Sequence, residues 1–287
     1  MKNINEKEVD FYIDYIKYPH IKYFIPIKAG IYDIIINIKN DIRDIKKYLF
    51  LFNDFLFEFD LQFFDFSKLI NIEKMFSNLN NLVYIDLSSF DTRNLTSMEN
   101  MFYQCENLKS IDLSSFDTTN VTSMSGMFYQ CKNLQSIDLF SFDTRNVTNM
   151  ENMFYQCGNL KSINLSSFDT RNVTNMENMF YQCGLKSIDL SSFDTRNVIK
   201  MGYMFRECYS LKNINISNFN TRNVKDMNNM FAYTSLENLD LSSFDMENVT
   251  EMTNMFGGTP LKEIKIKKNQ KIINELLSYS KPKIIFV

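Results

Sequence analysis

The residue types that most often do chemistry recur in this chain at one fixed interval. Its five cysteines lie 25 or 26 residues apart, and the row then gives way to Thr234. Zinc sites pair cysteines only a few residues apart, so this spacing indicates a repeat and not a set of metal ligands. Stacked repeats would bring neighbouring cysteines to about 5 Å, within the range of a disulfide. We predict buried free thiols instead, because the number is odd and the context favours a reducing compartment. The row comprises Cys105, Cys131, Cys157, Cys183 and Cys208.

Catalytic constellations are not visible in the sequence. His20 is the single histidine and follows Pro19, outside the repeats, so no Ser-His-Asp or Cys-His arrangement can be assembled around it. Gly257-Gly258 has no phosphate-loop pattern around it. We therefore predict that the protein is not an enzyme and has no catalytic residue, no cofactor and no metal site.

One polar row remains as a candidate partner-binding face. Ile111 and Leu113 alternate with Asp112, so a strand that buries the two apolar side chains points the aspartate outward. Like charges on neighbouring strands repel by on the order of 1 kcal/mol or less per exposed pair, so keeping them implies a compensating row or a partner. Solubility and edge protection are the alternative explanation. The face comprises Asp86, Asp112, Asp138, Asn164, Asp189, Asn215 and Asp240, flanked by serines such as Ser110 and Ser114.

Three further rows each support a prediction. A tyrosine stripe, a secondary candidate for binding, is explained equally well by half-buried packing. Arginines that follow each turn are predicted to pair with neighbouring acids, and the aspartates beside the core phenylalanines to bind the N–H two positions on. The Asn-Val-Thr sequons are predicted to be turn residues and not glycosylation sites. The stripe is Tyr103, Tyr129, Tyr155 and Tyr181; the arginines are Arg93, Arg145, Arg171, Arg196 and Arg222; the aspartates are Asp91, Asp117, Asp143, Asp169, Asp194 and Asp245.

The element that must position these rows is a unit of 25 or 26 residues, of which 142–167 is the clearest copy. Its second half alternates apolar and polar residues through Ile163, which predicts a short strand. Its first half places Val147, Met150, Met153 and Phe154 at helical spacing, which predicts a short helix or turn. Thr148 and Glu151 have the spacing of a capping box at the start of such a helix.

A unit this short cannot bury its own apolar face, but stacked copies can. We therefore predict an α/β repeat fold, a leucine-rich-repeat-like solenoid of about nine rungs. The predicted organisation is an N-terminal cap with a degenerate first repeat over 1–55, repeats over 56–266, and a C-terminal cap over 267–287. Within the last, residues 269–279 are expected to form a helix with Ile272, Ile273, Leu276 and Leu277 inward, followed by a strand over 283–287.

The repeat consensus S-I-D-L-S-S-F-D-T-R-N-V-T-x-M-x-x-M-F-x-x-C resembles the BspA-like leucine-rich-repeat family, the 26-residue repeat of bacterial surface proteins. The resemblance covers roughly residues 56–266. It implies a β-solenoid-like fold and a surface or adhesive role, and it supplies no catalytic residues.

The composition of the chain limits the classes of partner that we expect. The net charge is −3, and we expect no nucleic-acid partner. The start, MKNINEKEVDFYIDY, has no apolar segment of a secretion signal, and no run long enough to span a membrane occurs. The localisation is therefore cytoplasmic by sequence and the cell surface by resemblance. We predict a monomeric binding module for a protein or glycan, with a cytoplasmic interaction scaffold as the alternative.

Overall fold

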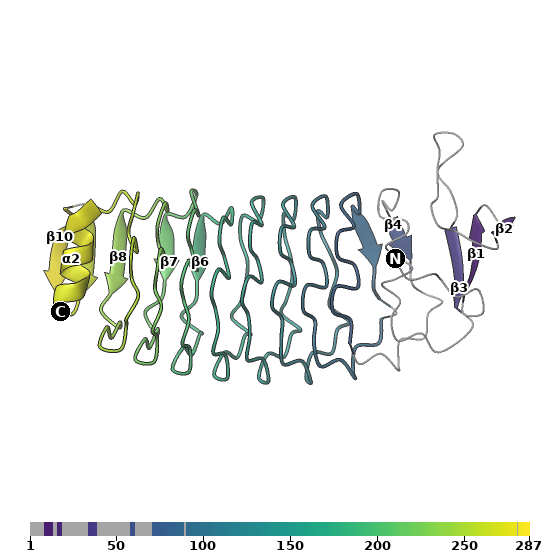
Figure 1. Cartoon of the computed structure of the whole chain (residues 1–287), viewed down its shortest axis with the longest axis horizontal. Helices are drawn as coiled ribbons and strands as arrows, with labels where there is room; N and C mark the ends of the chain where they lie inside the picture. Colours follow the sequence, from purple (N-terminus) through teal and green to yellow (C-terminus); the bar gives the residue numbers. More distant parts are fainter. Residues whose placement is uncertain are drawn as a thin grey trace.

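The computed structural model describes residues 9–13, 16–18, 34–38, 58–60, 71–88, 90–279 and 281–287. From residue 71 onward the chain winds into stacked turns along one axis, a leucine-rich-repeat-like solenoid (Figure 1). Equivalent residues of successive turns lie beside one another, so each sequence row becomes a row in space. The predicted repeat fold is therefore confirmed over this part of the chain.

Short strands form one side of the solenoid. Within the described residues they pair in parallel and in register, so that the predicted strand centres face each other: Phe59 with Ile85, Ile188 with Ile214, and Leu239 with Ile264. The strands are β4 (Glu58–Asp60), β5 (Tyr84–Asp86), β6 (Ser187–Asp189), β7 (Asn213–Asn215), β8 (Asn238–Leu241) and β9 (Glu263–Ile266). Ahead of them β1 (Val9–Ile13) pairs antiparallel with both β2 (Ile16–Tyr18) and β3 (Ile34–Ile38).

The strand side is less regular between β5 and β6. The predicted strands around Ile111, Ile137 and Ile163 are not formed there, although all three side chains contribute to the core. Ile137 and Ile163 are half-buried, as Ile214 of β7 is. Asparagine side chains supply part of the link instead, with Asn133 Nδ2 donating to Asn107 Oδ1 at 3.0 Å and Asn159 Nδ2 to Asn133 Oδ1 at 2.9 Å.

The opposite side consists of consecutive turns, so of the two alternatives predicted for the first half of the unit, a short helix or a turn, the turn is the one that forms. Asn152 and Gln156 have φ of 57° and 58°, left-handed conformations that an α-helix excludes. The Met153 and Cys157 amides donate to the carbonyls three residues earlier, Met150 and Phe154, which closes β-turns. Turns of this length place the same residues inward as a helix would, which explains the misleading periodicity.

The capping box predicted from Thr148 and Glu151 is also absent. The Glu151 N–H donates to Asn149 Oδ1 at 3.0 Å, and Thr148 Oγ1 donates to the Thr122 carbonyl of the preceding turn. Each of these turns is joined to the next by an isolated parallel β-bridge. The sequence did not predict this row of bridges. This row runs through Asn71, Ser97, Ser123, Asn149, Asn175, Lys200, Asp226 and Glu251.

Stacked apolar rows fill the interior, as predicted. Phe154 is fully buried, with ring centroids 5.7 Å from those of Phe128 and of Phe180, and the ring planes are nearly parallel. Phe142 and the methionines Met150 and Met153 are buried beside it. This continuous core holds the polar rows of the surface at a fixed spacing of one turn.

The C-terminal segment has the predicted helix and strand. Helix α2 (Gln270–Tyr279) lies against the last turn, with Ile272 and Leu276 buried (Figure 1). Leu277 was predicted to point inward but is 54% exposed, because it lies on the outer side of the helix. Strand β10 (Lys283–Phe286) then pairs in parallel with β9.

The predictions at the N-terminus are tested only in part. Within the predicted cap over 1–55, Ile34–Ile38 form β3, and β4, at the start of the predicted repeats, pairs in register with β5. His20 lies outside the described residues, as do most of residues 1–55.

Candidate functional site

The row of acids and amides on the strand side is exposed, as predicted, with Asp86 half-buried. In each residue of the row, one side-chain oxygen also accepts a hydrogen bond from the backbone N–H two residues on. The sequence did not predict this bond for the row. Ser114 N–H donates to Asp112 Oδ1 at 2.9 Å, and Phe140 N–H donates to Asp138 Oδ1 at 2.9 Å. The same bond forms at Asp86, Asn164, Asp189, Asn215 and Asp240.

These turn bonds explain why each position of the row has a side chain that can accept a hydrogen bond. They do not explain why most of these side chains are charged. The Ser114 N–H holds the pKa of Asp112 below its ordinary value, and the Ser191 N–H does the same for Asp189. Both carboxylates therefore stay ionised at neutral pH. Asn164 and Asn215 keep the turn bond without a charge, so the turn alone does not require aspartate. At the C-terminal end Asp240 has a cationic partner, since its carboxylate lies 3.5 Å from Lys265 Nζ.

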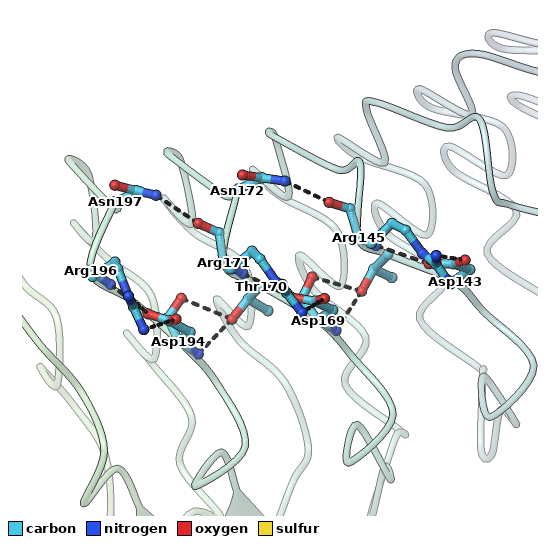
Figure 2. A network of polar contacts seen from close by, with 10 residues as sticks. Asp143, Arg145, Asp169, Thr170, Arg171, Asn172, Asp194, Arg196 and Asn197 are labelled. Carbon is cyan, nitrogen blue, oxygen red and sulfur yellow. Dashed lines mark hydrogen bonds and ion pairs between the residues drawn. The ribbon is translucent and has the colours of Figure 1, made fainter.

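The next corner of each turn carries paired charges. The Arg171 N–H donates to Asp169 Oδ1 at 3.2 Å, and the guanidinium of the same arginine contacts both oxygens of that carboxylate (Figure 2). Both predictions for these rows, the Asx turn and the ion pair, are confirmed here. The same pairing recurs at Arg93 with Asp91, Arg145 with Asp143 and Arg196 with Asp194. Arg222 follows Asn220 instead, and only its backbone N–H donates to that side chain.

Threonine and asparagine side chains tie these corners together. The buried Thr170 hydroxyl donates to the Asp194 carbonyl at 3.0 Å and accepts from the Asp194 N–H at 2.8 Å (Figure 2). Asn172 Nδ2 donates to the Arg145 carbonyl of the preceding turn at 2.7 Å. Sequon asparagines such as Asn172 are thus structural turn residues, in agreement with the prediction.

Shallow depressions lie between successive corners. One, of about 690 Å³, is lined by Phe140, Asp143, Arg145, Asp169 and Arg171, among others. The next lies between the Asp169 and Asp194 corners and has a volume of about 600 Å³. Phe140 stands where neighbouring turns have serine, and its side chain is 72% exposed. We call this series of depressions the corner groove.

The tyrosine stripe forms a stack on the turn side. Ring centroids lie 4.5 Å apart between Tyr103 and Tyr129, 4.4 Å between Tyr129 and Tyr155, and 4.5 Å between Tyr155 and Tyr181. All four side chains are half-buried, and burial raises the pKa of Tyr129 to about 12. The geometry thus agrees with the packing alternative, because ring faces that stack on each other are not open to a partner.

Glutamines form a second ladder beside the tyrosines. Gln104 Nε2 donates to Gln130 Oε1 at 2.7 Å, and the chain of amides continues through Gln156 and Gln182 to the carboxylate of Glu207. Each amide donates in the same direction along the axis. The sequence shows these glutamines at one repeat position, but their mutual bonding was not predicted.

The turn at 201–211 interrupts both ladders. Arg206 replaces the tyrosine, and its guanidinium carbon lies 5.8 Å from the ring centroid of Tyr181, 5.6 Å from that of Tyr203 and 5.9 Å from that of Tyr233. Glu207 replaces the glutamine and accepts from Tyr181 Oη at 2.9 Å. This cluster was missed at the sequence level, although its departures from the repeat are visible there.

The thiols are buried as predicted, and each donates to a main-chain carbonyl. Cys157 Sγ lies 3.2 Å from the Phe128 carbonyl oxygen, and burial raises the pKa of the Cys105 thiol to about 12. No group of His, Cys, Asp or Glu side chains in the described residues is arranged to hold a metal ion. Likewise, none of the helices described has both the length and the apolarity to cross a membrane.

Comparison with known families places the chain. Residues 46–164 and 156–269 match the family described as Mycoplasma protein of unknown function, DUF285. The chain belongs to the DUF285 family. The strand-side, corner and tyrosine residues described above all lie within the matched ranges.

A leucine-rich repeat protein from Bacteroides ovatus ATCC 8483, whose crystal structure was determined at 1.19 Å, is similar with a TM-score of 0.47 and 18% identity. The similarity covers 92% of this chain and 65% of that chain, so the DUF285 protein spans about two thirds of the other's length. A search of curated proteins found no significant match.

Proposed function

We propose that the protein is a non-enzymatic binding module that presents its strand-side row to a protein or glycan partner, in the surface or adhesin-like role that the BspA-like resemblance implies. The observation that carries the proposal is that the strand-side row has more negative charge than its turns require. Asp112, Asp138 and Asp189 are exposed, yet the asparagines of the same row make the same turn bond without a charge. The organisation into a cap over 1–55, repeats over 56–266 and a cap over 267–287 is part of this proposal.

The test removes the charges and keeps the turns. A variant with Asp112→Asn, Asp138→Asn and Asp189→Asn is applied to a panel of purified extracellular proteins and glycans beside the unaltered protein. Binding should weaken at least tenfold, while the melting temperature changes little because asparagine supports the same Asx turn. Equal binding by both proteins would contradict a charge-dependent strand-side site.

The surface role has its own test. Protease treatment of intact source cells, followed by mass spectrometry, should release peptides from residues 90–250 without markers of lysis. Release of these peptides only after lysis would instead favour a cytoplasmic scaffold.

A further inference from the structure

The first two depressions of the corner groove each lie between two Asp–Arg pairs. Its first depression is lined by the corners that contain Asp143 and Asp169, the next by those of Asp169 and Asp194. A third, of about 440 Å³, follows between the Asp194 corner and Asn220. A partner that fits the whole series must itself present similar groups at a regular interval. A polymer built from one or two kinds of monomer meets that condition better than a peptide of varied sequence.

Charge narrows the class of polymer. Arg145, Arg171 and Arg196 are each paired with an aspartate of their own turn at 2.7 to 2.8 Å, so the field of each guanidinium is largely cancelled. A nucleic acid or an acidic polysaccharide is held chiefly by unpaired cations. Paired arginines and aspartates instead offer donors and acceptors to an uncharged ligand that carries hydroxyl groups.

The backbone of the corner excludes strand addition as the binding mode. The Asp169 N–H donates to Thr144 Oγ1, and the Arg171 N–H donates to Asp169 Oδ1. An extended peptide that adds to a sheet edge needs unpaired main-chain groups. These corner amides are already satisfied, so recognition in the groove must use side chains.

Phe140 supplies the apolar part. Its ring is 72% exposed beside the first depression, and the equivalent residues are Ser114 and Ser166. Binding sites for small units commonly combine an aromatic surface with a few placed polar groups. The C–H face of a sugar ring packs on such an aromatic side chain while the hydroxyls at its edge reach planar polar groups, here Arg145 and Asp169.

We propose that the corner groove binds a neutral polysaccharide, with Phe140 as the surface on which one sugar packs and the Asp–Arg pairs as hydrogen-bonding subsites for the sugars that follow. This inference rests on the proposed function as a binding module, and it names the partner class and a second face. The two faces adjoin at Phe140, whose N–H donates to Asp138 Oδ1, but they are tested with different side-chain substitutions.

Affinity electrophoresis of the full chain in native gels tests the proposal. The gels contain dextran, laminarin or galactomannan as neutral probes, or heparin as the acidic probe. At least one neutral polysaccharide should retard the protein, and Phe140→Ser should raise the dissociation constant tenfold or more. This variant restores the residue of neighbouring turns, so its fold should be intact.

Arg171→Lys should weaken binding as well, because lysine cannot form the planar bidentate pair. Tyr209→Ser, at a 63% exposed ring in the turn at 201–211, is the matched control and should bind like the unaltered protein.

Three outcomes would overturn the assignment: no retardation by any neutral probe, retardation by heparin alone, or equal binding by the Phe140→Ser variant. None of these affects the strand-side proposal, whose test depends on Asp112, Asp138 and Asp189. Loss of partner binding in that asparagine variant, with no glycan retardation, would remove only the polysaccharide inference.

Discussion

Asp91 shows how one side chain closes a corner of the solenoid. Its carboxylate accepts from the backbone N–H of Arg93 at 3.2 Å and forms an ion pair with the same guanidinium at 2.7 Å. Asp112 makes the corresponding backbone bond at the exit of the strand side, and Asn149 makes it at the bridge row. Short polar side chains thus fix the bends, and each acts within its own turn.

The first prediction concerns the loss of folding stability at low pH. Hydrogen bonds from Arg93 lower the pKa of Asp91 from 3.8 to about 2. A carboxyl group whose folded-state pKa is depressed contributes stability that is present above pH 3.8 and is lost as pH falls through about 2. Titration of the Asp91 carboxyl carbon by NMR should give this low value. Arg93→Gln should move it back towards 3.8, and an unchanged value would contradict the assigned cause.

The second prediction concerns the buried threonines. Thr170→Val keeps the shape but leaves the N–H and carbonyl of Asp194 without their partner, which should cost about 1–3 kcal/mol. Thr174→Val is the matched control, because that hydroxyl is exposed and the carbonyl it contacts also accepts a backbone N–H. Urea unfolding measures both variants. Equal destabilisation would show that the Thr170 hydroxyl has no special role.

The third prediction concerns the thiols. Burial raises the pKa of each cysteine, to about 12 for Cys105, so almost no reactive thiolate forms at pH 8. An aromatic disulfide reagent should find no thiol in the native protein and all five after unfolding without reductant. Recovery of three or fewer would mean that some cysteines are oxidised.

At the scale of the element, each turn must adapt where the repeat shortens from 26 to 25 residues. Gly184 lies at the first such place, and its N–H donates to the Cys157 carbonyl at 3.2 Å. A Cβ built there would lie 2.1 Å from the carbonyl oxygen of Gly158. The shorter turn is therefore accommodated by a close approach of two backbones, which only glycine allows.

The fourth prediction follows from that approach. Gly184→Ala should destabilise the protein by about 1–3 kcal/mol, the range measured for overpacking, because the opposing atom is main chain and cannot rotate away. Gly158→Ala provides the control, since nothing lies within 4 Å of its added Cβ. Thermal unfolding should place the control within about 0.5 kcal/mol of the unaltered protein. Tolerance of both changes would contradict a close approach of the two backbones at Gly184.

At the scale of the whole molecule, stability is carried by contacts between neighbouring turns. Phe154 contacts rings on both sides, whereas among the described phenylalanines Phe256 stacks on Phe231 alone, with 6.2 Å between the ring centroids. In such quasi-one-dimensional structures a defect spreads mainly to adjacent units. The position of a substitution along the axis should therefore decide how much of the molecule it affects.

The fifth prediction tests this dependence on position. Phe154→Ala should cost about 3–5 kcal/mol and raise hydrogen exchange in the turns on both sides of it. Phe256→Ala should raise exchange in the turn of Phe231 and in the C-terminal segment, and leave the turns around Phe154 unchanged. Hydrogen–deuterium exchange with mass spectrometry resolves the two patterns. A uniform increase in all turns for both variants would indicate a single cooperative unit instead.

Sequence periodicity predicted the core well, because the phenylalanine row recurs at the repeat spacing whatever the local conformation. It predicted strands that form at Ile188 and Ile214 but not around Ile163. It did not decide between a helix and a turn in the first half of the unit, since both bury the same positions. Asn152 was a signal for the turn, because asparagine tolerates the left-handed conformation that it adopts there. At the candidate site, exposure of Asp112 was predictable from alternation. Its Asx bond was not, because that depends on how the strand ends.

The irregular turn at 201–211 was also open to prediction and was missed. Tyr203 has φ of 61° at a position filled by asparagine in neighbouring turns, a strained choice for a bulky residue. Arg206 and Glu207 change in the same turn.

The bond from Thr144 to the Asp169 main chain is repeated from Thr118 to Asp143 and from Thr170 to Asp194. Every such contact joins the same two repeat positions of neighbouring turns, so one unit can serve as neighbour to almost any other. Removal of residues 142–167 would set Thr118 against Asp169 with the same partners. Recombination between near-identical gene segments can therefore lengthen or shorten this protein by whole units, and selection can tune its reach without redesigning a single interface.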